Sequence, residues 1–430
     1  MGNKNKTPLF SEHFSPCLTK TTNLLVEKGE GPYLITTKGE KYLDLVQGIA
    51  VNALGHSHPA IVDASCKQIK NLIHGSFNLV NFPSTLQLAS EMRKITPGKL
   101  DMFFFTNSGA ETIEASLKLA RYISGRTSFI AFSGSFHGRT MGAASITSSN
   151  MRFRKSYAPF LSQVYFVPYP YCFRCAFGKD VDTCNIECLN YVKNEFHYAI
   201  PPDDVSAVIF EPILGEGGYI VPPSKYVHAL REMCDRHRIY LIFDEVQSGM
   251  GRTGKMFSGE HYNIVPDILC LGKAVGGGFP LAILASTKEN MTKWETGAHG
   301  TTFGGHPVAA AAALAQLKIL TREGFLKEVE KKGRHFRSRL MDLAEKFPEI
   351  GDVRGLGLML GIEFITEGKA PNPEKAKSVQ KYLFEKNILV MTCGAFKQVL
   401  RFTPPLNISE TLLDHTINVL KDALDAGTRT

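Results

Sequence analysis

Residues 239–254, IYLIFDEVQSGMGRTG, carry the strongest structural signal in the chain. Five apolar residues in a row predict a strand that is buried on both faces, which is typical of a parallel sheet covered by helices. Asp244 and Glu245 follow at the carboxyl end of this strand. An ionised carboxylate in that position is costly unless a positive group faces it. The alternative interpretation is a strand-end carboxylate that caps a neighbouring helix or loop.

Similar apolar runs recur on both sides of this stretch, separated by helical segments or long connections. Helical periodicity is clearest in AETIEASLKLARYIS (110–124) and KYVHALREMCDRH (225–237). Strands that alternate with helices predict an α/β fold with a mostly parallel sheet. The runs expected to form strands are 102–105, 128–132, 164–167, 207–210, 240–243 and 268–271.

The two ends of the chain have a different pattern. Residues 1–58 hold two short strand-like pieces, GPYLITTKG and KYLDLV, and a charged helix after Gly324 leads to GLMLGIEF, ILVMT and VLRFT. These alternations predict a smaller α+β unit. We therefore expect an N-terminal segment over 1–58, a large α/β domain over 59–324 and a small domain over 325–430.

Composition places the chain among ordinary globular proteins. Its 430 residues are 43% hydrophobic and 21% charged, which excludes a disordered or fibrous protein. The net charge of +8 is spread along the chain, so we expect neither nucleic acid nor a membrane as a partner. No apolar segment follows the N-terminal lysines as a signal peptide would require, and the nine cysteines are dispersed. A reducing cytoplasm is the expected compartment.

Lys273 lies at the end of another strand-like run, DILCLGKAVGGGFP (267–280). A lysine between an apolar strand and three glycines is desolvated and open to a ligand. Desolvation lowers its pKa and makes the neutral amine a nucleophile for carbonyls. The alternative is a lysine whose amine extends past the strand end to solvent. Asp244 lies one strand–helix step earlier, so both residues can meet at the sheet edge where α/β proteins bind ligands.

The segment FFTNSGAE (104–111) passes directly from a strand to a helix. Small residues at a helix N-terminus leave N–H groups free to bind a phosphate. Ser108 can equally be an ordinary N-cap, with Glu111 completing a capping box. A lysine, an acid and a phosphate site on one sheet are together what pyridoxal phosphate needs: an imine-forming amine, a partner for the pyridine nitrogen and a cradle for the phosphate.

These residues resemble those of the class III pyridoxal-phosphate aminotransferases, and within that family the 4-aminobutyrate aminotransferases. The resemblance spans nearly the whole chain, and its motifs are NSGAETIEAS, SFHGRT, EPILGEGG, IFDEVQSGMGRTG, LGKAVGGGFP, TTFGGHPVA and PEIGDVRGLGLMLGIE. It implies the type I, aspartate-aminotransferase-like fold, in which the large domain binds the cofactor and residues 1–58 join the small domain. It also implies a homodimer with shared active sites, with a higher oligomer left open.

The resemblance implies a role for each matching position in the cofactor site. Lys273 would bind the cofactor aldehyde and move the substrate proton, and Asp244 would pair with the ring nitrogen. Phe136 and Val246 would cover the two ring faces, and Gln247 would hydrogen-bond the phenolic oxygen. The implied cofactor-binding residues are Ser108, Gly109, Ala110, Phe136, His137, Asp244, Val246, Gln247, Lys273 and, from the partner subunit, Thr302.

The resemblance also implies how substrates bind. Arg139 would hold the distal carboxylate of an ω-amino acid, and Arg401 the α-carboxylate of glutamate or 2-oxoglutarate. Glu216 would pair with Arg401 whenever an ω-amino acid is bound, while Ile49 and Glu211 would have supporting positions. Guanidinium–carboxylate geometry suits this recognition. The implied reaction is a ping-pong transfer of the amino group of an ω-amino acid, 4-aminobutyrate above all, to 2-oxoglutarate.

Two features depart from the family pattern. His306 stands where the family usually has asparagine, beside the phosphate-binding threonine. Four cysteines, at 172, 175, 184 and 188, lie in an insertion-like loop. Four thiolates can form a zinc site, but the spacing between the two pairs is shorter than in a zinc ribbon, so a cysteine-rich surface flap is the alternative. We assign no metal ligand from the sequence.

Other functions of the same fold remain open from the sequence. Ornithine and acetylornithine aminotransferases share much of the pattern. Amino-acid racemases or epimerases keep the lysine and the aspartate, but they tend to lose the arginine of HGRT and to shorten the GEGG glutamate to aspartate. Arg139 and Glu216 are both present and count against racemisation. A non-catalytic protein would leave Lys273 and Asp244 without a role.

Overall fold

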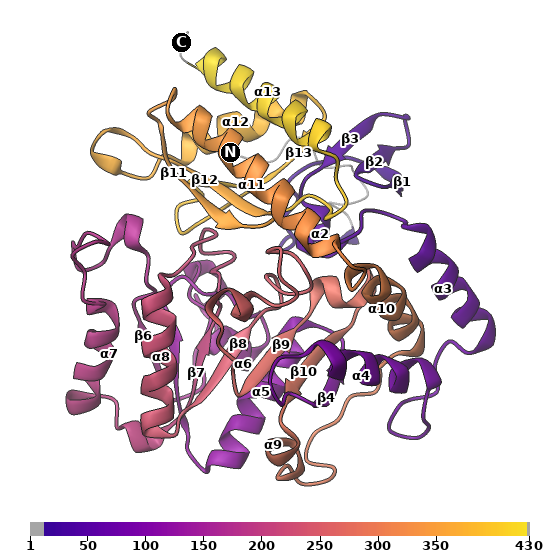
Figure 1. The fold of residues 1–430 in the computed structure, drawn as a ribbon, viewed down its shortest axis with the longest axis vertical. Coiled ribbons are helices and arrows are strands. Elements are labelled where there is room, and N and C mark those ends of the chain that lie inside the picture. Colours follow the sequence, from indigo (N-terminus) through magenta and orange to yellow (C-terminus); the bar gives the residue numbers. More distant parts are fainter. Residues whose placement is uncertain (1–12, 428–430) are drawn as a thin grey trace.

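The computed structural model describes residues 13–427, and a seven-stranded sheet forms the centre of its larger part (Figure 1). The strand order is β4-β10-β9-β8-β7-β5-β6. Neighbouring strands from β9 through to β6 run parallel, whereas β10 is antiparallel to both β9 and β4. The strands are β4 (Met102–Thr106), β5 (Ser128–Phe132), β6 (Val164–Val167), β7 (Val205–Phe210), β8 (Tyr240–Asp244), β9 (Ile268–Leu271) and β10 (Ala282–Ser286). The predicted α/β fold with a mostly parallel sheet is confirmed.

All six strands predicted for this sheet form, with ends that shift by two residues at most. The sequence analysis missed β10. Only Phe279, Pro280 and Leu281 separate this strand from the three glycines, and its run AILAS is short and built mostly of small residues. It is fully buried because β4 and β9 hydrogen-bond to it on both sides.

The sheet is covered on both faces, as its continuous apolar strands require. Along β8 the side chains alternate: Ile242 packs in the cluster that contains residues of α5 (Gly109–Ser124), whereas Leu241 and Phe243 pack with residues of α8 (Ser224–His237). Both helices were predicted, with almost the same bounds. The carboxyl ends of the parallel strands are thereby left as the edge at which side chains can meet a ligand.

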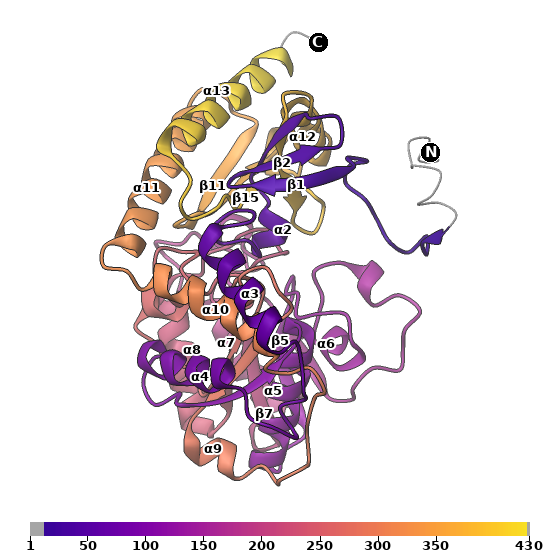
Figure 2. The same cartoon turned by 90° about the vertical axis from the view of Figure 1, so that its right-hand side faces the viewer.

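Two smaller four-stranded sheets lie beyond the large one. The first consists of β1 (Val26–Glu30), β2 (Tyr33–Thr36), β3 (Lys41–Asp44) and β13 (Ile388–Leu389), and the second of β11 (Ile350–Leu356), β12 (Met359–Phe364), β15 (Val399–Phe402) and β14 (Met391–Cys393). β13 pairs in parallel with β3, so segments from both ends of the chain share one sheet. In Figure 2 the N-terminal strands β1 and β2 lie in the same part of the molecule as β11 and β15. The run ILVMT, expected as one strand, divides at the buried Val390 into strands of different sheets.

Helices complete the two parts of the molecule. A charged helix was predicted after Gly324, and α11 begins at the next residue, with Gly324 at φ 81° as its N-cap. The boundaries of the expected domains stay a prediction. The other helices are α2 (Gln47–Ala50), α3 (Pro59–Asn71), α4 (Pro83–Ile95), α6 (Met141–Ser145), α7 (Glu187–Tyr198), α9 (Lys288–Thr292), α10 (Pro307–Leu320), α11 (Phe325–Ala344), α12 (Pro373–Glu385) and α13 (Glu410–Gly427).

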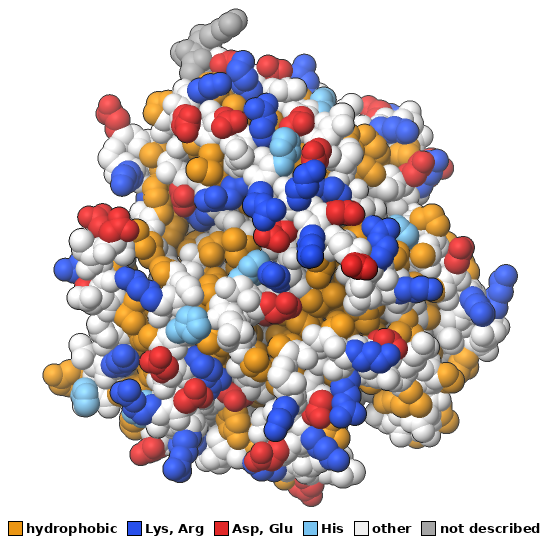
Figure 3. Space-filling model, in the orientation of Figure 1, with side chains coloured by type: hydrophobic (Ala, Val, Ile, Leu, Met, Phe, Trp, Pro, Cys, Tyr) orange, Lys and Arg blue, Asp and Glu red, His pale blue; other side chains and the backbone are white. Residues whose placement is uncertain are grey.

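The surface has mixed charge on the face shown in Figure 3, where basic and acidic side chains are interspersed over both parts of the molecule. A single-sign patch of the kind that binds nucleic acid is therefore not formed on that face. In the part of the chain that the structure describes, no helix is both long and apolar enough to cross a membrane.

A buried carboxylate joins the second small sheet to the loop that follows β6. Glu363 of β12 accepts hydrogen bonds from Arg354 of β11, at 2.6 Å, and from the side chains of Tyr171 and Arg174. Arg354 also donates to the carbonyl of Gly218, at 2.7 Å. Burial opposes ionisation of Glu363, but Arg354 and the other donors outweigh it and lower the pKa of this carboxyl.

Replacing Glu363 by glutamine is expected to destabilise the protein by about 1.5–3 kcal/mol, because it removes the fully buried one of the two carboxylates that pair with Arg354, the other being Asp352 at 2.8 Å. The stabilisation is present above the ordinary glutamate pKa and is lost as the pH falls through the lowered one. Urea unfolding midpoints at several pH values measure it. The matched control is Glu289→Gln, which breaks an exposed 2.9 Å pair with Lys293 and should leave the midpoint in place. An equal shift in both variants would contradict the expected role of Glu363.

Candidate active site

A cavity of about 320 Å³ opens at the carboxyl ends of the parallel strands and collects most of the residues expected at a cofactor site. Its walls combine the ends of β8 and β9, the N-terminus of α5 and the loops after β5 and β7. Gly138, at φ 140°, lines it as well and was not predicted. The lining residues are Gly109, Ala110, Phe136, His137, Gly138, Arg139, Glu211, Glu216, Asp244, Val246, Gln247 and Lys273.

Asp244 is the last residue of β8, and a histidine supplies the positive group that the sequence analysis required. Oδ2 of Asp244 lies 2.7 Å from Nδ1 of His137, and Oδ1 of Asp244 accepts the N–H of Val246 at 3.0 Å. Burial alone would lower the pKa of His137, but the hydrogen bond to Asp244 and the charges of Asp244 and Glu211 raise it. The two side chains therefore form a buried ion pair, and the capping interpretation accounts for only one of the carboxylate oxygens.

Lys273 lies two residues after the end of β9, beyond Gly272, and lines the cavity. Its backbone has φ 45°, in the left-handed region that a non-glycine residue rarely adopts. Burial lowers the pKa of Lys273, while the charges of Asp244 and Glu211 act in the opposite direction. A lowered pKa increases the fraction of neutral amine, which is what a nucleophile for a carbonyl needs.

The N-terminus of α5 faces the cavity through Gly109 and Ala110. A Cβ on Gly109 would lie 2.7 Å from Cγ1 of Val246, so only glycine fits at this position. Ser108 is the N-cap, and its Oγ accepts the N–H of Glu111 at 3.3 Å. The Glu111 carboxylate bonds the N–H of Asn107 rather than that of Ser108, so the expected capping box is incomplete. The α5 N–H groups are nevertheless placed to bind an anion.

The walls also hold polar atoms that have no partner in the protein. Oε1 of Gln247 and Nε2 of His137 are buried without a hydrogen bond. Buried polar groups of native proteins are almost always satisfied, so these two atoms call for a ligand. Unpartnered polar atoms, a carboxylate, a lysine amine and a helix N-terminus around one cavity fit a planar cofactor that carries an aldehyde, a ring nitrogen, a hydroxyl and a phosphate.

Glu211 lies beneath the cavity and connects two of its loops. Its carboxylate oxygens accept the N–H groups of Phe136 and Gly215, each at 2.8 Å. Burial, helped by the charge of Asp244, raises the pKa of Glu211 to about 7, and His137 limits the rise. Glu211 thus fixes the two loops to each other, and its supporting role toward substrate stays a prediction.

Some of the residues expected to recognise substrate line the cavity, and others do not. Arg139 lines the cavity, is exposed, and lies 4.9 Å from the ring centroid of Phe153. Glu216 lines it too, and its Oε2 is 2.9 Å from NH1 of the buried Arg401. Ile49 is 40% exposed, adopts φ 66° and does not line the cavity of the single chain.

Thr302 lies in the loop between α9 and α10, and His306 lies directly before α10. Thr302 is exposed and does not line the cavity, so its contribution from a partner subunit stays a prediction. His306 is the N-cap of α10, where its Nδ1 accepts the N–H of Val308 at 3.3 Å. Its ring stacks on His74 with centroids 5.2 Å apart. Histidine at this position therefore serves the packing of the helix start.

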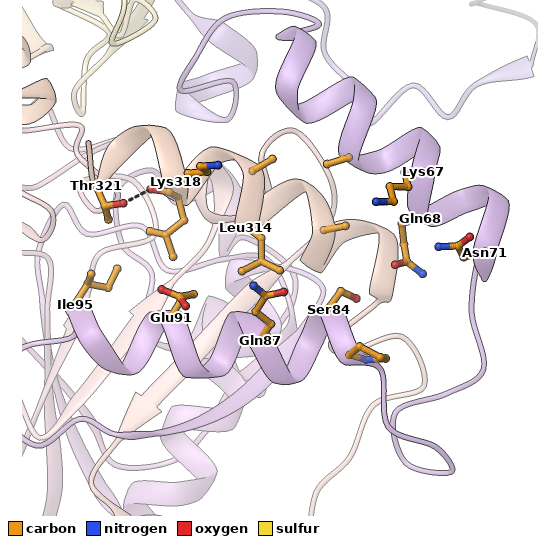
Figure 4. A pocket seen from close by; sticks show the side chains of 15 residues that line it. Lys67, Gln68, Asn71, Ser84, Gln87, Glu91, Ile95, Leu314, Lys318 and Thr321 are labelled. Carbon is orange, nitrogen blue, oxygen red and sulfur yellow. Dashed lines mark hydrogen bonds between the residues drawn. The ribbon is translucent and has the colours of Figure 1, made fainter. Parts of the chain in front are cut away.

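A larger cavity lies elsewhere. It has a volume of about 640 Å³, opens between α3, α4 and α10, and is lined by polar side chains that include Lys67, Gln87, Glu91 and Lys318 (Figure 4). No residue predicted for the site lines it. Cavity volume alone would therefore have selected the wrong region of the molecule.

The four cysteines of the insertion line a narrow cavity with Tyr171 and Glu187, and all of them are free. Cys184 donates to a carboxylate oxygen of Glu187 at 2.8 Å. Within residues 13–427, no group of three or more histidine, cysteine or acidic side chains is arranged to hold a metal ion. We therefore propose no metal for the cysteine loop.

Comparison with known proteins identifies relatives along the whole length of the chain. The family Aminotransferase class-III matches residues 17–424. An acetylornithine aminotransferase of Methanopyrus kandleri is 41% identical over 93% of each chain. A probable 4-aminobutyrate aminotransferase of Bacillus subtilis is 33% identical over 94% of this chain and 93% of that protein. An alanine/serine racemase of Pyrococcus horikoshii is 32% identical over 93% and 85%, respectively.

The fold has solved counterparts among transaminases. A PLP-bound amine transaminase from an uncultivated Pseudomonas species aligns with 99% of both chains, at a TM-score of 0.88 and 27% identity. That structure and the family match together assign the cofactor expected from the cavity walls.

Proposed function

The chain belongs to the class III aminotransferase family, whose cofactor is pyridoxal 5'-phosphate, and we propose that it transfers the amino group of an ω-amino acid to 2-oxoglutarate. The proposed donor is 4-aminobutyrate. The observation that carries this proposal is the pairing of Glu216 with Arg401 on the wall of the cavity that contains Lys273.

The bound cofactor would supply an aldehyde that accepts amino groups and a ring that withdraws electrons from the substrate carbon. Around it, Lys273 would hold the cofactor and move the substrate proton. Asp244, held by the His137 ring at 2.7 Å, would face the ring nitrogen and keep it positively charged. Phe136 and Val246 would confine the ring between them, and the N-terminus of α5 would bind the phosphate.

Two arginines would let one site accept two substrates of different shape. Arg139 would bind the carboxylate distant from the reacting amine of the donor. Glu216 neutralises Arg401 while such a donor is bound, because the donor has no carboxylate beside its amine. Glutamate and 2-oxoglutarate carry a second carboxylate, which would displace Glu216 and form a bidentate pair with Arg401.

A second donor, N-acetylornithine, is favoured by one observation. The acetylornithine aminotransferase of Methanopyrus kandleri is 41% identical to this chain, against 33% for the probable 4-aminobutyrate aminotransferase of Bacillus subtilis. The transferred amine of N-acetylornithine is also far from its carboxylate, so Arg139 and Glu216 would serve it in the same way.

The test is a half-reaction on the holoenzyme with 4-aminobutyrate alone, followed by the absorbance of the cofactor. We expect the cofactor to convert to its amino form and to revert when 2-oxoglutarate is added. N-acetylornithine and L-alanine are run in parallel as donors. Conversion by N-acetylornithine but not 4-aminobutyrate would select the second donor. Proton exchange and racemisation of alanine, without conversion of the cofactor, would overturn the aminotransferase proposal.

A further inference from the structure

Glu216 has a second cationic partner that the sequence analysis did not assign. Its Oε2 lies 2.9 Å from NH1 of Arg401, and its Oε1 lies 2.9 Å from Nζ of Lys397. Each carboxylate oxygen therefore has a cation of its own. Lys397 and Arg401 are four residues apart in FKQVLR; Lys397 lies in the turn before β15, at φ 64°, and Arg401 lies within β15.

The two cations differ in how freely they can move. Arg401 lies within β15 and its side chain is 4% exposed, whereas the side chain of Lys397, in the turn before β15, is 35% exposed. The carbonyl of Glu216 accepts the N–H of Gly394 at 2.9 Å, which fixes the main chain of Glu216 to the same turn. The carboxylate can therefore change partners by side-chain rotation while the loop stays in place. Because the side chain of Lys397 is a flexible four-carbon chain, its amine can move together with the Glu216 carboxylate.

The site has two states, one in which Glu216 pairs with Arg401 and one in which a substrate carboxylate does, and the two states differ in net charge. While Glu216 pairs with Arg401, two cations share one anion. When a substrate carboxylate occupies Arg401, two anions face two cations, and the charges cancel. Burial opposes ionisation of Glu216, but Arg401 and Lys397 outweigh it and lower the pKa of Glu216 in the state in which it pairs with Arg401. Without Lys397 the first state would be neutral and the second would carry an excess negative charge, which a partly buried site disfavours.

We propose that Lys397 holds the displaced carboxylate of Glu216 when Arg401 binds the α-carboxylate of a dicarboxylate substrate. Lys397 thereby sets the preference of the site for 2-oxoglutarate and glutamate. The inference rests on the proposed function and deepens it. Lys397 is a positioning residue, since its amine contacts Glu216 and none of the reacting atoms.

The test compares Lys397→Met with Lys397→Arg in the holoenzyme, using glutarate as an unreactive dicarboxylate. In Lys397→Met we expect the KM for 2-oxoglutarate and the calorimetric Kd for glutarate to rise about 10-fold, the effect of losing one charge-assisted hydrogen bond. The KM for the amino donor should stay within about 2-fold, because the donor-bound state loses only an excess charge. Lys397→Arg should restore both values for the dicarboxylates.

The matched control is Lys293→Met, which breaks a pair of the same 2.9 Å length with Glu289. Lys293 directly follows α9, which lies far from β11 and β12, two strands of the sheet that contains β15 (Figure 1). Lys293→Met removes the same charge as Lys397→Met, and it should change the KM of neither the amino donor nor 2-oxoglutarate. Equal changes of KM for donor and acceptor, or unchanged glutarate affinity in Lys397→Met, would overturn the inference alone. A wild-type enzyme that neither binds glutarate nor uses 2-oxoglutarate would instead overturn the proposed function.

Discussion

Replacing Lys273 by alanine is expected to remove the covalent attachment of the cofactor and to lower the turnover number by about 10⁴–10⁶-fold, the range found when a nucleophile that bonds covalently is deleted. The reason is geometric. Lys273 is the lysine that lines the cavity, and burial lowers the pKa of its amine toward the neutral, nucleophilic form. Borohydride reduction followed by peptide mass spectrometry measures the attachment independently of activity.

The control for Lys273→Ala is Lys255→Ala, which removes an exposed lysine that lies beyond the strand end of β8 and outside the cavity lining. This variant should retain both the reducible cofactor and the activity. Cofactor still attached covalently to Lys273→Ala would show that a different lysine holds it. Activity that survives without attachment would instead contradict the role given to the amine.

Much of this site could be predicted from the sequence because its residues follow strands. Asp244 and Lys273 each follow a continuous apolar run, and such runs predict buried strands of an α/β sheet. The two strands are neighbours in the structure. β8 and β9 pair in parallel, with Asp244 opposite Cys270, so the two residues emerge at the same edge. Local patterns also predicted α5 and the glycine at its start.

What could not be predicted are the contacts between distant segments. The His137 ring meets Asp244 across 107 positions, and Lys397 meets Glu216 across 181. No local periodicity encodes such pairs, because each residue is compatible with a solvent-facing position in its own segment. β10 was missed for a related reason: its short run becomes a strand only because β4 and β9 leave a gap that it fills.

The substitution Asp244→Asn keeps the shape of the side chain while removing its charge, and it is expected to lower kcat/KM by about 10²–10³-fold. That factor corresponds to about 3–4 kcal/mol, the size of the loss when one group that stabilises developing charge is removed from an active site. Asparagine can still accept the N–H of Val246, so the strand end should keep its conformation. The pKa of His137 is raised by Asp244 and would fall in the variant, because burial would then act without the opposing carboxylate. His137 would become neutral, and the ring nitrogen would lose the anion proposed to keep it protonated.

The pH dependence separates this electrostatic role from a structural one. In the wild type the pKa of His137 is raised, so the ring keeps its proton to a higher pH than an ordinary histidine, and the absorbance of the bound cofactor should change only above the ordinary histidine range. In Asp244→Asn burial lowers the pKa of His137 without the opposing carboxylate, so the absorbance should change below that range instead. His137→Asn offers the comparison: an amide N–H in place of Nδ1 still donates to Asp244, so we expect about a 10-fold loss and a constant spectrum. If Asp244→Asn retains wild-type kcat/KM and the wild-type pH dependence of the spectrum, the carboxylate acts only in shaping the strand end. The protonation of the ring would then depend on another group.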